Sequence, residues 1–388
     1  MKSVAVIGCT GSIGSQTLDV LSRHQDVFDV RLITCFRNIG KAKENALIFP
    51  NVRIATHDSS QESLFNQDMM VGDQAIIDFI ITNHIQIVVI ASSSIETTSL
   101  VHSILPYVDK VAISSKEVII VTGSLGLISS EWKEKVLPVD SEHAAIHQLL
   151  RYAERETIQQ VVLTASGGPF YSQQPVPDLT HITPSLALKH PTWQMGKKVT
   201  IDSATLVNKG IELLEAHYLF DLPPEMLQVV IHPQSIIHAM LQFKDGSTLS
   251  QMAYPDMRLP IAYALFYPER TDLPYITPID TQAFPMCSFV HKQASDIPVV
   301  ALALECLRES GLSPIWYVLA DEIAVEAFLN QKIRFVQIAD FLRYSIEKLP
   351  TLYSVRSLSI DQKGISIFIH DVRQNIQRLL IQFKKQVA

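Results

Sequence analysis

Residues 1 to about 125 alternate short apolar runs with amphipathic stretches. The apolar runs are Val4–Ile7, Val30–Cys35, Val52–Ala55, Ile85–Ile90 and Val111–Ser114. They are short, rich in valine and isoleucine, and mostly uninterrupted by polar residues. This pattern predicts strands that are buried on both faces of a parallel sheet. Because the stretches between the runs have helical spacing, we expect βαβ units and an α/β, Rossmann-like, doubly wound sheet.

The pattern changes between about residues 140 and 265. Strands are expected at Val161–Thr164, Val229–Ile231, Ile236–Phe243 and Ser247–Ala253, and helices at His143–Glu154 and Leu206–Leu219. The Asp245-Gly246 pair between the last two strands is typical of a hairpin turn. This segment therefore predicts an α+β domain with long loops.

The segment from Tyr267 to Pro298 is rich in Pro, Thr and Asp and lacks periodicity, which is typical of a linker. After it, helical periodicity predicts an all-α C-terminal domain with helices at Val299–Leu307, Ala320–Leu329, Val336–Ile346 and Val372–Phe383. We therefore expect four parts, with residues 1–139, 140–266, 267–298 and 299–388.

Composition narrows the class of protein. A chain of 388 residues with 47% hydrophobic residues is long enough for two or three domains with sizeable cores. No apolar run approaches the roughly 18 residues of a membrane span, and a net charge of -7 disfavours nucleic acid as the main ligand. The N-terminus leads directly into a strand without a signal-peptide pattern, and the four cysteines form no C-x-x-C pair. We therefore expect a soluble cytoplasmic protein with free thiols.

Residues Gly8 to Gly14 read Gly-x-x-Gly-x-x-Gly, after a predicted strand and at the start of a predicted helix. Glycines at such a turn let backbone N–H groups and the helix N-terminus approach a pyrophosphate. A purely structural turn is the alternative. About twenty residues further on, where NAD enzymes hold an acidic residue for the ribose, Arg37 lies at the end of the second predicted strand, in Cys35–Asn38. A cation there suits the 2′-phosphate of NADP.

Asp140 and Glu142 lie two residues apart in an extended segment, so their carboxylates can point the same way and share a hard cation such as Mg²⁺ or Mn²⁺. Helix capping is the alternative, with Asp140 or Ser141 as the N-cap and Glu142 favoured by the helix dipole. From this segment alone capping is the better explanation. A third ligand can come from Glu212 or Glu215, one helical turn apart, and the sequence does not choose between them.

Two glycine-containing loops are candidates for anion binding and for a lid. Ser166-Gly167-Gly168 ends a predicted strand with exposed amides and a hydroxyl, which favours an anion site, although an ordinary loop is about as plausible. The aperiodic segment from Lys189 to Lys197 mixes aromatic, thioether and cationic residues with glycine, as a mobile lid does.

The run from Asp202 to Glu212 leads polar donors into a helix. Ser203, Asn208 and Lys209 can meet a phosphate at the helix N-terminus, whereas Ser203 or Thr205 as an N-cap is the competing interpretation.

Taken together and in order, these segments resemble the 1-deoxy-D-xylulose 5-phosphate reductoisomerase family, over nearly the whole chain. The matching segments are Gly8–Gly14, Ser115–Glu117, Val139–His143, Ser166–Phe170, His190–Gly196, Asp202–Glu212, Ile231–His238 and Pro255–Arg258. The resemblance implies an N-terminal NADPH domain, a central catalytic domain that also forms a homodimer, and a C-terminal helical domain.

The resemblance also implies roles for individual residues. The implied ligands of a divalent metal (Mg²⁺, Mn²⁺ or Co²⁺) are Asp140, Glu142 and Glu212. The implied substrate-binding residues are Ser141, Ser166, His190, Trp193, Ser203, Asn208, Lys209 and Glu212. The implied NADPH contacts are Thr10, Gly11, Ser12, Ile13, Arg37, Asn38, Lys116, Glu117, Met195 and Gly196. The implied catalytic residues are Lys116, Glu142, His190 and His238.

The chemistry implied by the resemblance is a metal-dependent rearrangement of 1-deoxy-D-xylulose 5-phosphate. Retro-aldol and aldol steps give a branched aldehyde, which NADPH reduces to 2-C-methyl-D-erythritol 4-phosphate for non-mevalonate isoprenoid biosynthesis. A non-catalytic NADP-binding sensor of the same fold is the alternative, and the three carboxylates disfavour it. Two positions differ from the family pattern, the segment Ser92–Glu96 and Ser115, both on the expected nicotinamide side.

Overall fold

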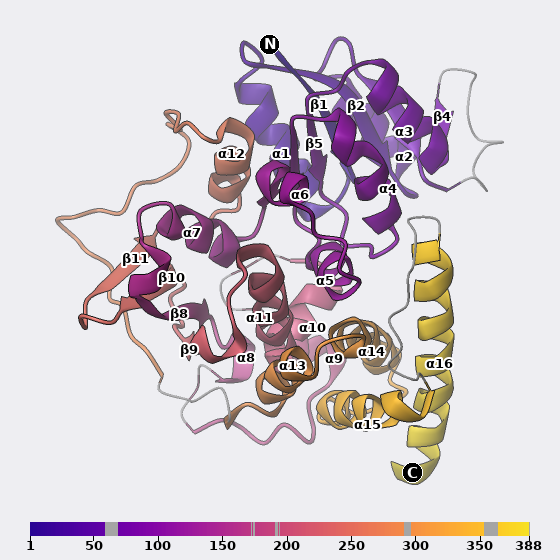
Figure 1. Cartoon of the computed structure of the whole chain (residues 1–388), viewed down its shortest axis with the longest axis vertical. Helices are drawn as coiled ribbons and strands as arrows, with labels where there is room; N and C mark the ends of the chain where they lie inside the picture. The colour runs from indigo at the N-terminus through magenta and orange to yellow at the C-terminus, as the bar shows by residue number, and fades with distance from the viewer. Residues whose placement is uncertain are drawn as a thin grey trace. The chain divides into compact units, whose positions relative to one another are not determined.

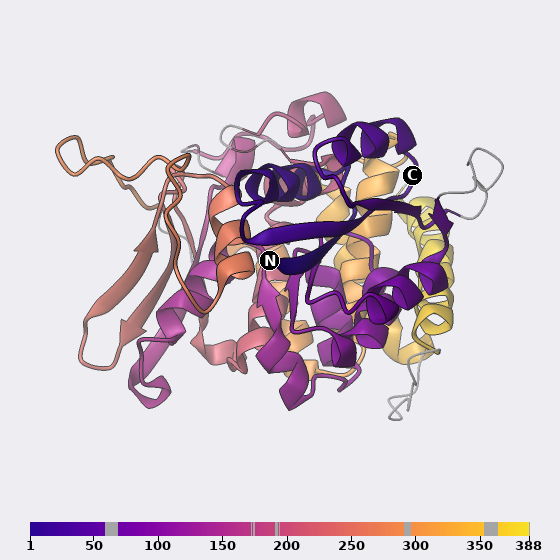
Figure 2. The same cartoon turned by 90° about the horizontal axis from the view of Figure 1, so that it is seen from above.

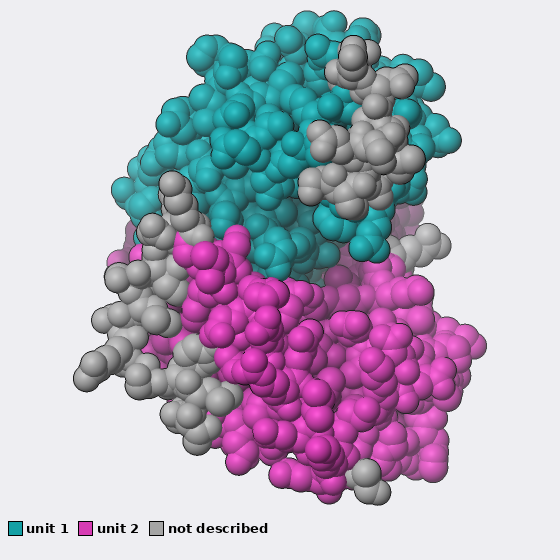
Figure 3. Space-filling model, turned by 90° about the vertical axis from the view of Figure 1, so that its right-hand side faces the viewer, with its two compact units in different colours: residues 1–118, 128–144, 256–276 teal, residues 119–127, 145–255, 277–388 magenta. Residues whose placement is uncertain are grey.

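The computed structural model describes residues 1–58, 69–171, 173, 175–190, 193, 195–290, 296–352 and 364–387. Pro191, Thr192 and Gln194 of the expected lid lie outside the described residues. The chain forms two compact units, which Figure 3 colours separately. Unit 1 comprises residues 1–118, 128–144 and 256–276, and unit 2 comprises residues 119–127, 145–255 and 277–388.

Unit 1 is built on a wholly parallel sheet of seven strands in the order β4-β3-β2-β1-β5-β6-β7. Its strands are β1 (Lys2–Ile7), β2 (Phe28–Cys35), β3 (Arg53–Thr56), β4 (Met70–Val71), β5 (Ile87–Ile90), β6 (Lys110–Ile113) and β7 (Val136–Pro138). Helices lie on both faces of the sheet (Figures 1 and 2). The predicted doubly wound sheet is therefore confirmed, and the strand order reverses between β1 and β5, where such sheets bind their ligands.

The helices of unit 1 are α1 (Ser12–Arg23), α2 (Ile39–Ala46), α3 (Asp73–Thr82), α4 (Thr97–Ile104), η2 (Leu105–Tyr107), α6 (Ser130–Lys135) and α12 (Arg258–Phe266). Helices α5 (Lys116–Ser124) and α7 (Ser141–Leu150) begin in unit 1 and continue in unit 2. Helix α12 comes from much later in the chain but packs against α1, β6 and β7, with Ile261, Ala264 and Leu265 at most 1% exposed. The core of unit 1 is therefore completed by a returning segment.

Unit 2 contains a four-stranded mixed sheet in the order β11-β10-β8-β9. Its strands are β8 (Ile158–Ala165), β9 (Leu227–Ile231), β10 (Ile237–Phe243) and β11 (Thr248–Met252). The predicted hairpin is confirmed: the Phe243 N–H donates to the Ser247 carbonyl at 2.9 Å, and Gly246 takes a positive φ of 86°. The remaining elements before residue 230 are η3 (Arg155–Thr157), α8 (Gly168–Tyr171), α9 (Pro184–Ala187), α10 (Lys197–Thr205), α11 (Val207–Phe220) and η4 (Pro224–Met226).

Within the described residues after 296, unit 2 is completed by four helices, which confirm the expected all-α region. Figure 1 shows them in orange to yellow. They are α13 (Pro298–Glu309), α14 (Ser313–Leu329), α15 (Gln337–Leu352) and α16 (Gly364–Val387). Most of α14 is buried, including Trp316, Tyr317 and Phe328. A helix that is apolar all round has no polar face to give it periodicity, so the sequence pattern predicts only its second half.

Some elements differ from the expected ones. Strands β4 and β7, of two and three residues, were not predicted, and neither was α10. Helix α7 starts at Ser141 and ends at Leu150, earlier at both ends than expected. Among the described residues, no helix combines the length and the apolar character that a membrane span requires.

Candidate active site

The glycine loop after β1 is held by close backbone packing. Gly8 takes a φ of 93°, and its N–H donates to Thr34 Oγ1 on β2 at 3.1 Å. A Cβ on Gly14 would lie 2.1 Å from the Gly8 carbonyl oxygen, so only glycine fits there. Gly11 precedes α1, and no side chain among the described residues caps that helix. This geometry fits a pyrophosphate, because the first-turn amides of α1 need an acceptor.

Two cations follow β2 on the side of the loop. Arg37 is exposed, and its guanidinium carbon lies 5.3 Å from the centre of the Phe36 ring. Asn38 caps α2 by accepting from the Lys41 N–H at 3.2 Å, and Lys41 Nζ donates to the Thr10 carbonyl at 3.3 Å. Lys41 is not among the residues expected from the sequence. A second cation four residues after Arg37, at the start of the amphipathic stretch that follows the second strand, is the signal that could have found it.

The serine-rich segment after β5 lies against the glycine loop. A Cβ on Gly8 would lie 3.1 Å from the backbone of Ala91 and of Ser92. Serine side chains shape the turn: Ser92 Oγ accepts from the Ser94 N–H at 3.2 Å, and Ser94 Oγ accepts from the Glu96 N–H at 3.3 Å. The serine side chains therefore stabilise the turn in the segment Ser92–Glu96.

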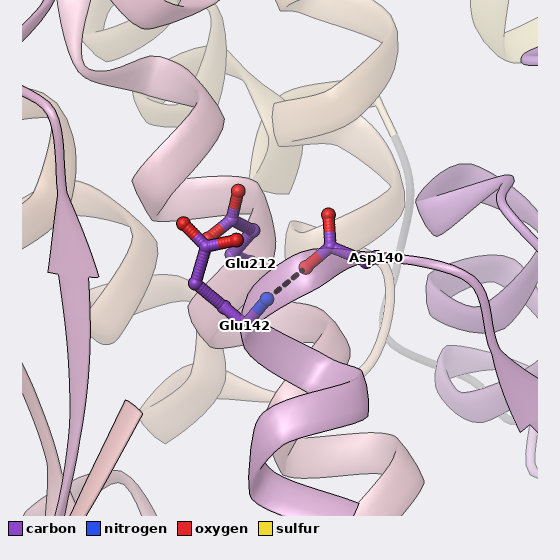
Figure 4. Close-up of side chains that lie close together, drawn as sticks. All are labelled: Asp140, Glu142 and Glu212. Atoms are coloured by element: carbon purple, nitrogen blue, oxygen red, sulfur yellow. Dashed lines mark hydrogen bonds between the residues drawn. The ribbon is translucent and has the colours of Figure 1, made fainter. Parts of the chain in front are cut away.

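Asp140 caps α7 with one carboxylate oxygen. Oδ1 accepts from the backbone N–H of Glu142 at 3.1 Å (Figure 4). It also accepts from the His143 N–H at 3.2 Å and lies 2.8 Å from His143 Nδ1. The other oxygen, Oδ2, accepts from Lys116 Nζ at the start of α5. Burial opposes ionisation, but the Lys116 ammonium and His143 outweigh it and hold the pKa of Asp140 well below its usual range. Asp140 is therefore a carboxylate at neutral pH.

Asp140, Glu142 and Glu212 each offer one carboxylate oxygen, and these oxygens all lie within 4.8 Å of one another (Figure 4). Hard oxygen donors of this kind suit Mg²⁺ or Mn²⁺, which usually complete their shells with water and substrate oxygens. The donor set therefore fits the expected divalent ion. It contains Glu212 and not Glu215, which resolves the choice that spacing left open.

Glu212 is held by two neighbours from its own helix. Asn208 Nδ2 donates to Oε1, and Lys209 Nζ donates to Oε2. Lys209 is 4% exposed and Glu212 1%, so the ion pair is buried. A buried carboxylate needs such partners because its desolvation is costly.

His190 joins the loop after β8 to α10. The Trp193 N–H donates to His190 Nδ1 at 2.9 Å, so the proton of the neutral ring lies on Nε2. Nε2 is 3.1 Å from both Ser166 Oγ and Ser203 Oγ. Burial lowers the pKa of His190, which favours the neutral ring. Each serine oxygen can accept from this imidazole and still donate its own O–H to an anion.

The Ser166 turn packs directly on the backbone of α10. Gly168 has a φ of 54°, and a Cβ there would lie 2.8 Å from the Ser203 carbonyl oxygen. Ser203 lies within α10, and α11 begins after Leu206, which takes a φ of 65°. The interpretation of Ser203 as a side-chain cap is therefore wrong, whereas Thr205 Oγ1 accepts from the N–H of Val207, the first residue of α11, at 3.3 Å.

The expected phosphate ligands come together as two groups. Ser166 and Ser203 meet at His190, whereas Asn208 and Lys209 meet at Glu212. That all four converge on one anion stays a prediction.

The remaining site candidates lie on several elements. Trp193 and Met195 are half-buried, and Gly196 is the N-cap of α10 with open space at its Cβ position. His238 is 5% exposed on β10. Ser115 is fully buried and donates to Glu117 Oε2 at 3.4 Å, and Ser141 Oγ donates to Glu142 Oε2.

His232 is fully buried in unit 2. It accepts from the Ile236 N–H at 3.0 Å and donates to the Ser288 carbonyl at 2.9 Å. Both ring nitrogens are thereby satisfied, so His232 is a packed core histidine.

Family models match three stretches of the chain. A model described as 1-deoxy-D-xylulose 5-phosphate reductoisomerase matches residues 4–123. Models of that enzyme's C-terminal domain match residues 136–220 and, for a second model, residues 252–364.

Curated relatives and solved structures carry the same description. The chain is 43% identical to the 1-deoxy-D-xylulose 5-phosphate reductoisomerase of Thermomicrobium roseum, covering 89% of this chain and 90% of the relative. It is 38% identical to that of Sulfurihydrogenibium sp. (strain YO3AOP1), covering 90% and 91%. The Zymomonas mobilis enzyme in complex with NADPH superposes with a TM-score of 0.84 at 31% identity, over 97% of this chain and 98% of that one. A DOX-P reductoisomerase in complex with NADPH, fosmidomycin and magnesium gives 0.87 at 30% identity, over 99% of each chain.

Proposed function

The chain belongs to the 1-deoxy-D-xylulose 5-phosphate reductoisomerase family, and from that premise we propose how its residues perform the reaction. It is an NADPH-dependent oxidoreductase that converts 1-deoxy-D-xylulose 5-phosphate to 2-C-methyl-D-erythritol 4-phosphate, a step of non-mevalonate isoprenoid biosynthesis, with a divalent metal. The observation that supports this most directly is the cluster of Asp140, Glu142 and Glu212. A non-catalytic NADP-binding sensor has no need of that cluster.

We assign NADPH to the carboxyl ends of β1 and β5. The loop residues Thr10, Gly11, Ser12 and Ile13 bind the pyrophosphate with backbone N–H groups at the start of α1. Arg37 and Asn38 bind the adenosine end, where the exposed guanidinium pairs with the 2′-phosphate. Lys116, Glu117, Met195 and Gly196 contact the nicotinamide side.

Asp140, Glu142 and Glu212 would hold the divalent ion, which as a Lewis acid stabilises negative charge on substrate oxygens, while bound NADPH supplies the hydride. Lys116 lies beside Asp140, so its ammonium can donate a hydrogen bond to a substrate hydroxyl or oxyanion. Ser141, next to Glu142, is placed to contact the same hydroxyls. Glu142 is the candidate for proton transfer in the rearrangement.

We place the substrate phosphate at Ser166 and Ser203, with Asn208 and Lys209 completing the cradle. The neutral His190 ring donates from Nε2 to the serine oxygens, which directs their O–H groups toward the anion. Binding this remote group holds the reacting carbons in place and contributes to the rate through orientation. Trp193 closes over the substrate as part of the lid, and lid closure excludes water.

His238 is proposed as a further active-site histidine. Its neighbour Ala239 pairs with Leu163 on β8, three residues before Ser166, so β10 lies beside the end of the strand that carries the phosphate turn. A histidine there can contact the substrate or orient a residue that does.

The larger-scale proposals are a homodimer, a cytoplasmic location and the four-part division at residues 139, 266 and 298. The edge strand β11, with Leu249 39% exposed, supports the dimer because an edge strand can pair with a second copy. The four cysteines are free, as in a reducing compartment. Light scattering at several protein concentrations tests the dimer, and a purely monomeric mass would contradict it.

The decisive experiment is NADPH oxidation by the purified protein with 1-deoxy-D-xylulose 5-phosphate and Mg²⁺ or Mn²⁺. We expect turnover that disappears with a chelator and returns with excess metal. Product identification by mass spectrometry separates rearrangement with reduction from NADPH oxidation alone. Binding of NADPH without turnover with either metal would favour the sensor.

A further inference from the structure

Lys198 bridges two buried carboxylates from different helices of unit 2. It lies in the first turn of α10, and its Nζ is 2.7 Å from Asp202 Oδ2 on α10 and 2.7 Å from Asp321 Oδ2 on α14. Asp202 is 1% exposed and Asp321 is not exposed at all. The bridge therefore ties a helix of the candidate site to the C-terminal helical region.

Because both carboxylates are buried, the bridge constrains the distance between the two helices. Two carboxylates that are removed from water need a cation within reach, and breaking one arm leaves a buried charge uncompensated. The lysine therefore fixes the distance between α10 and α14 more sharply than apolar contact does.

The bridged helix carries part of the phosphate site. Asp202 immediately precedes Ser203, whose hydroxyl lies 3.1 Å from His190 Nε2. Gly196, at the end of the lid segment, is the N-cap of the same helix. A shift of α10 therefore moves Ser203 and the end of the lid together.

Helix α14 also packs behind the metal-ligand helix. Tyr317, one turn before Asp321, is fully buried and donates to the Val299 carbonyl at 3.0 Å. A Cβ on Gly210 of α11 would lie 2.5 Å from the Tyr317 hydroxyl oxygen. Gly210 is two residues before Glu212, so one face of α14 contacts both helices that carry candidate site residues.

We propose that Lys198 and Asp321 are positioning residues, through which the C-terminal helical region sets the place of α10 and so the affinity for the substrate phosphate. Neither residue touches substrate in this proposal. Their effect passes through Ser203 and the lid, and the inference rests on the phosphate assignment made above.

The test compares Asp321→Asn with Glu322→Gln in the full-length enzyme. Glu322 is the next residue on α14, and its ion pair is with Arg373 on α16, at 3.0 Å, rather than with α10. We expect Asp321→Asn to lower kcat/KM for 1-deoxy-D-xylulose 5-phosphate by about 10- to 100-fold, mostly through KM, because misplaced binding groups are costly. The KM for NADPH should stay within about twofold, and Glu322→Gln should leave both constants near wild type.

A second variant guards against misfolding. Lys198→Gln combined with Asp202→Asn and Asp321→Asn removes the bridge without leaving a buried charge uncompensated, so this variant should fold and show the same rise in substrate KM. A fall in melting temperature with unchanged substrate KM in both variants would overturn the proposal. An equal rise in Glu322→Gln would also overturn it. If the wild-type enzyme itself shows no turnover, the proposed function is wrong. If the wild type is active and the variants are unaffected, only the positioning role is wrong.

Discussion

Asp140 caps a helix and also belongs to the cluster of three carboxylates. Capping and metal binding compete as explanations of Asp140 and Glu142 when only their spacing is known. In the structure, Oδ1 caps α7 while the carboxylate also belongs to the three-carboxylate cluster. The capping is therefore confirmed and the metal role stays a prediction, and the two are compatible because a carboxylate offers about four lone-pair directions.

Spacing could not choose between Glu212 and Glu215. They lie three residues apart on α11, so they share a face, and each is 1% exposed. Only the position of α7 in space distinguishes them. The phosphate residues illustrate the same limit, because His190 is joined to Ser166 and Ser203 by contacts between loops that no local pattern encodes.

Replacing Glu212 by Gln is expected to abolish turnover and to leave NADPH binding nearly intact, since the change removes one charged metal ligand. Glu215→Gln is the matched control and should retain metal-dependent activity. Steady-state rates and NADPH fluorescence titrations check both variants. A loss of both functions in Glu212→Gln would show that the metal assignment is wrong.

Arg37→Ala should raise the KM for NADPH more than the KM for NADH. An exposed guanidinium that pairs with a phosphate contributes roughly 1–3 kcal/mol, or about 10- to 100-fold in KM, and NADH has no phosphate for it to pair with. Parallel titrations with the two nucleotides measure the ratio. Equal effects on both would remove the 2′-phosphate role.

At the scale of elements, apolar runs and periodicity predict most strands and helices, because burial on one or two faces dictates them. The exceptions have physical causes. Strands β4 and β7 are too short to form a pattern, and α10 carries polar residues that face its own cluster rather than solvent. The 17-residue α14 is buried on all sides, so its start leaves no periodic signal.

The packing of α1 on the glycine loop gives an element-scale prediction. Gly14→Ala places a methyl group against the Gly8 backbone, so the turn must open and NADPH affinity should fall by at least about tenfold, as expected for a strained loop at a phosphate site. Gly40→Ala on α2 is the control, because its Cβ meets open space. That variant should bind NADPH normally and be slightly more stable. Isothermal titration and thermal melts separate the two effects.

At the scale of the whole molecule, the sequence predicts the fold class of each domain. It does not predict that residues 256–276 belong to unit 1. Nothing in the local pattern of α12 says that its apolar face covers α1. The contact between α12 and α1 depends on the path of the more than 200 residues between them, which no local pattern encodes.

Acid stability depends on His147 in α7. Burial, aided by Arg151, lowers the pKa of His147 to about 4 from an ordinary 6.5. The folded state therefore disfavours the imidazolium. The stability due to the neutral ring is present above pH 6.5 and is lost as the pH falls toward 4, by about 3 kcal/mol in total. His147→Asn should flatten the unfolding free energy over that range, whereas His370→Asn at an exposed site should not. Identical pH profiles of urea unfolding for the two variants would contradict this.

Because α12 packs in unit 1, this unit cannot finish folding until late in translation. A ribosome must translate residue 276 of 388 before the last piece of the first unit exists. Until then, the apolar surfaces of α1, β6 and β7 stay exposed to water. Ile261, Ala264 and Leu265 cover these surfaces in the folded protein. Domains that fold during translation usually close in order from the N-terminus. Here the mixed sheet of unit 2 is synthesised before unit 1 is complete. Unit 1 therefore keeps an exposed apolar surface, which chaperones can bind, until α12 has been made.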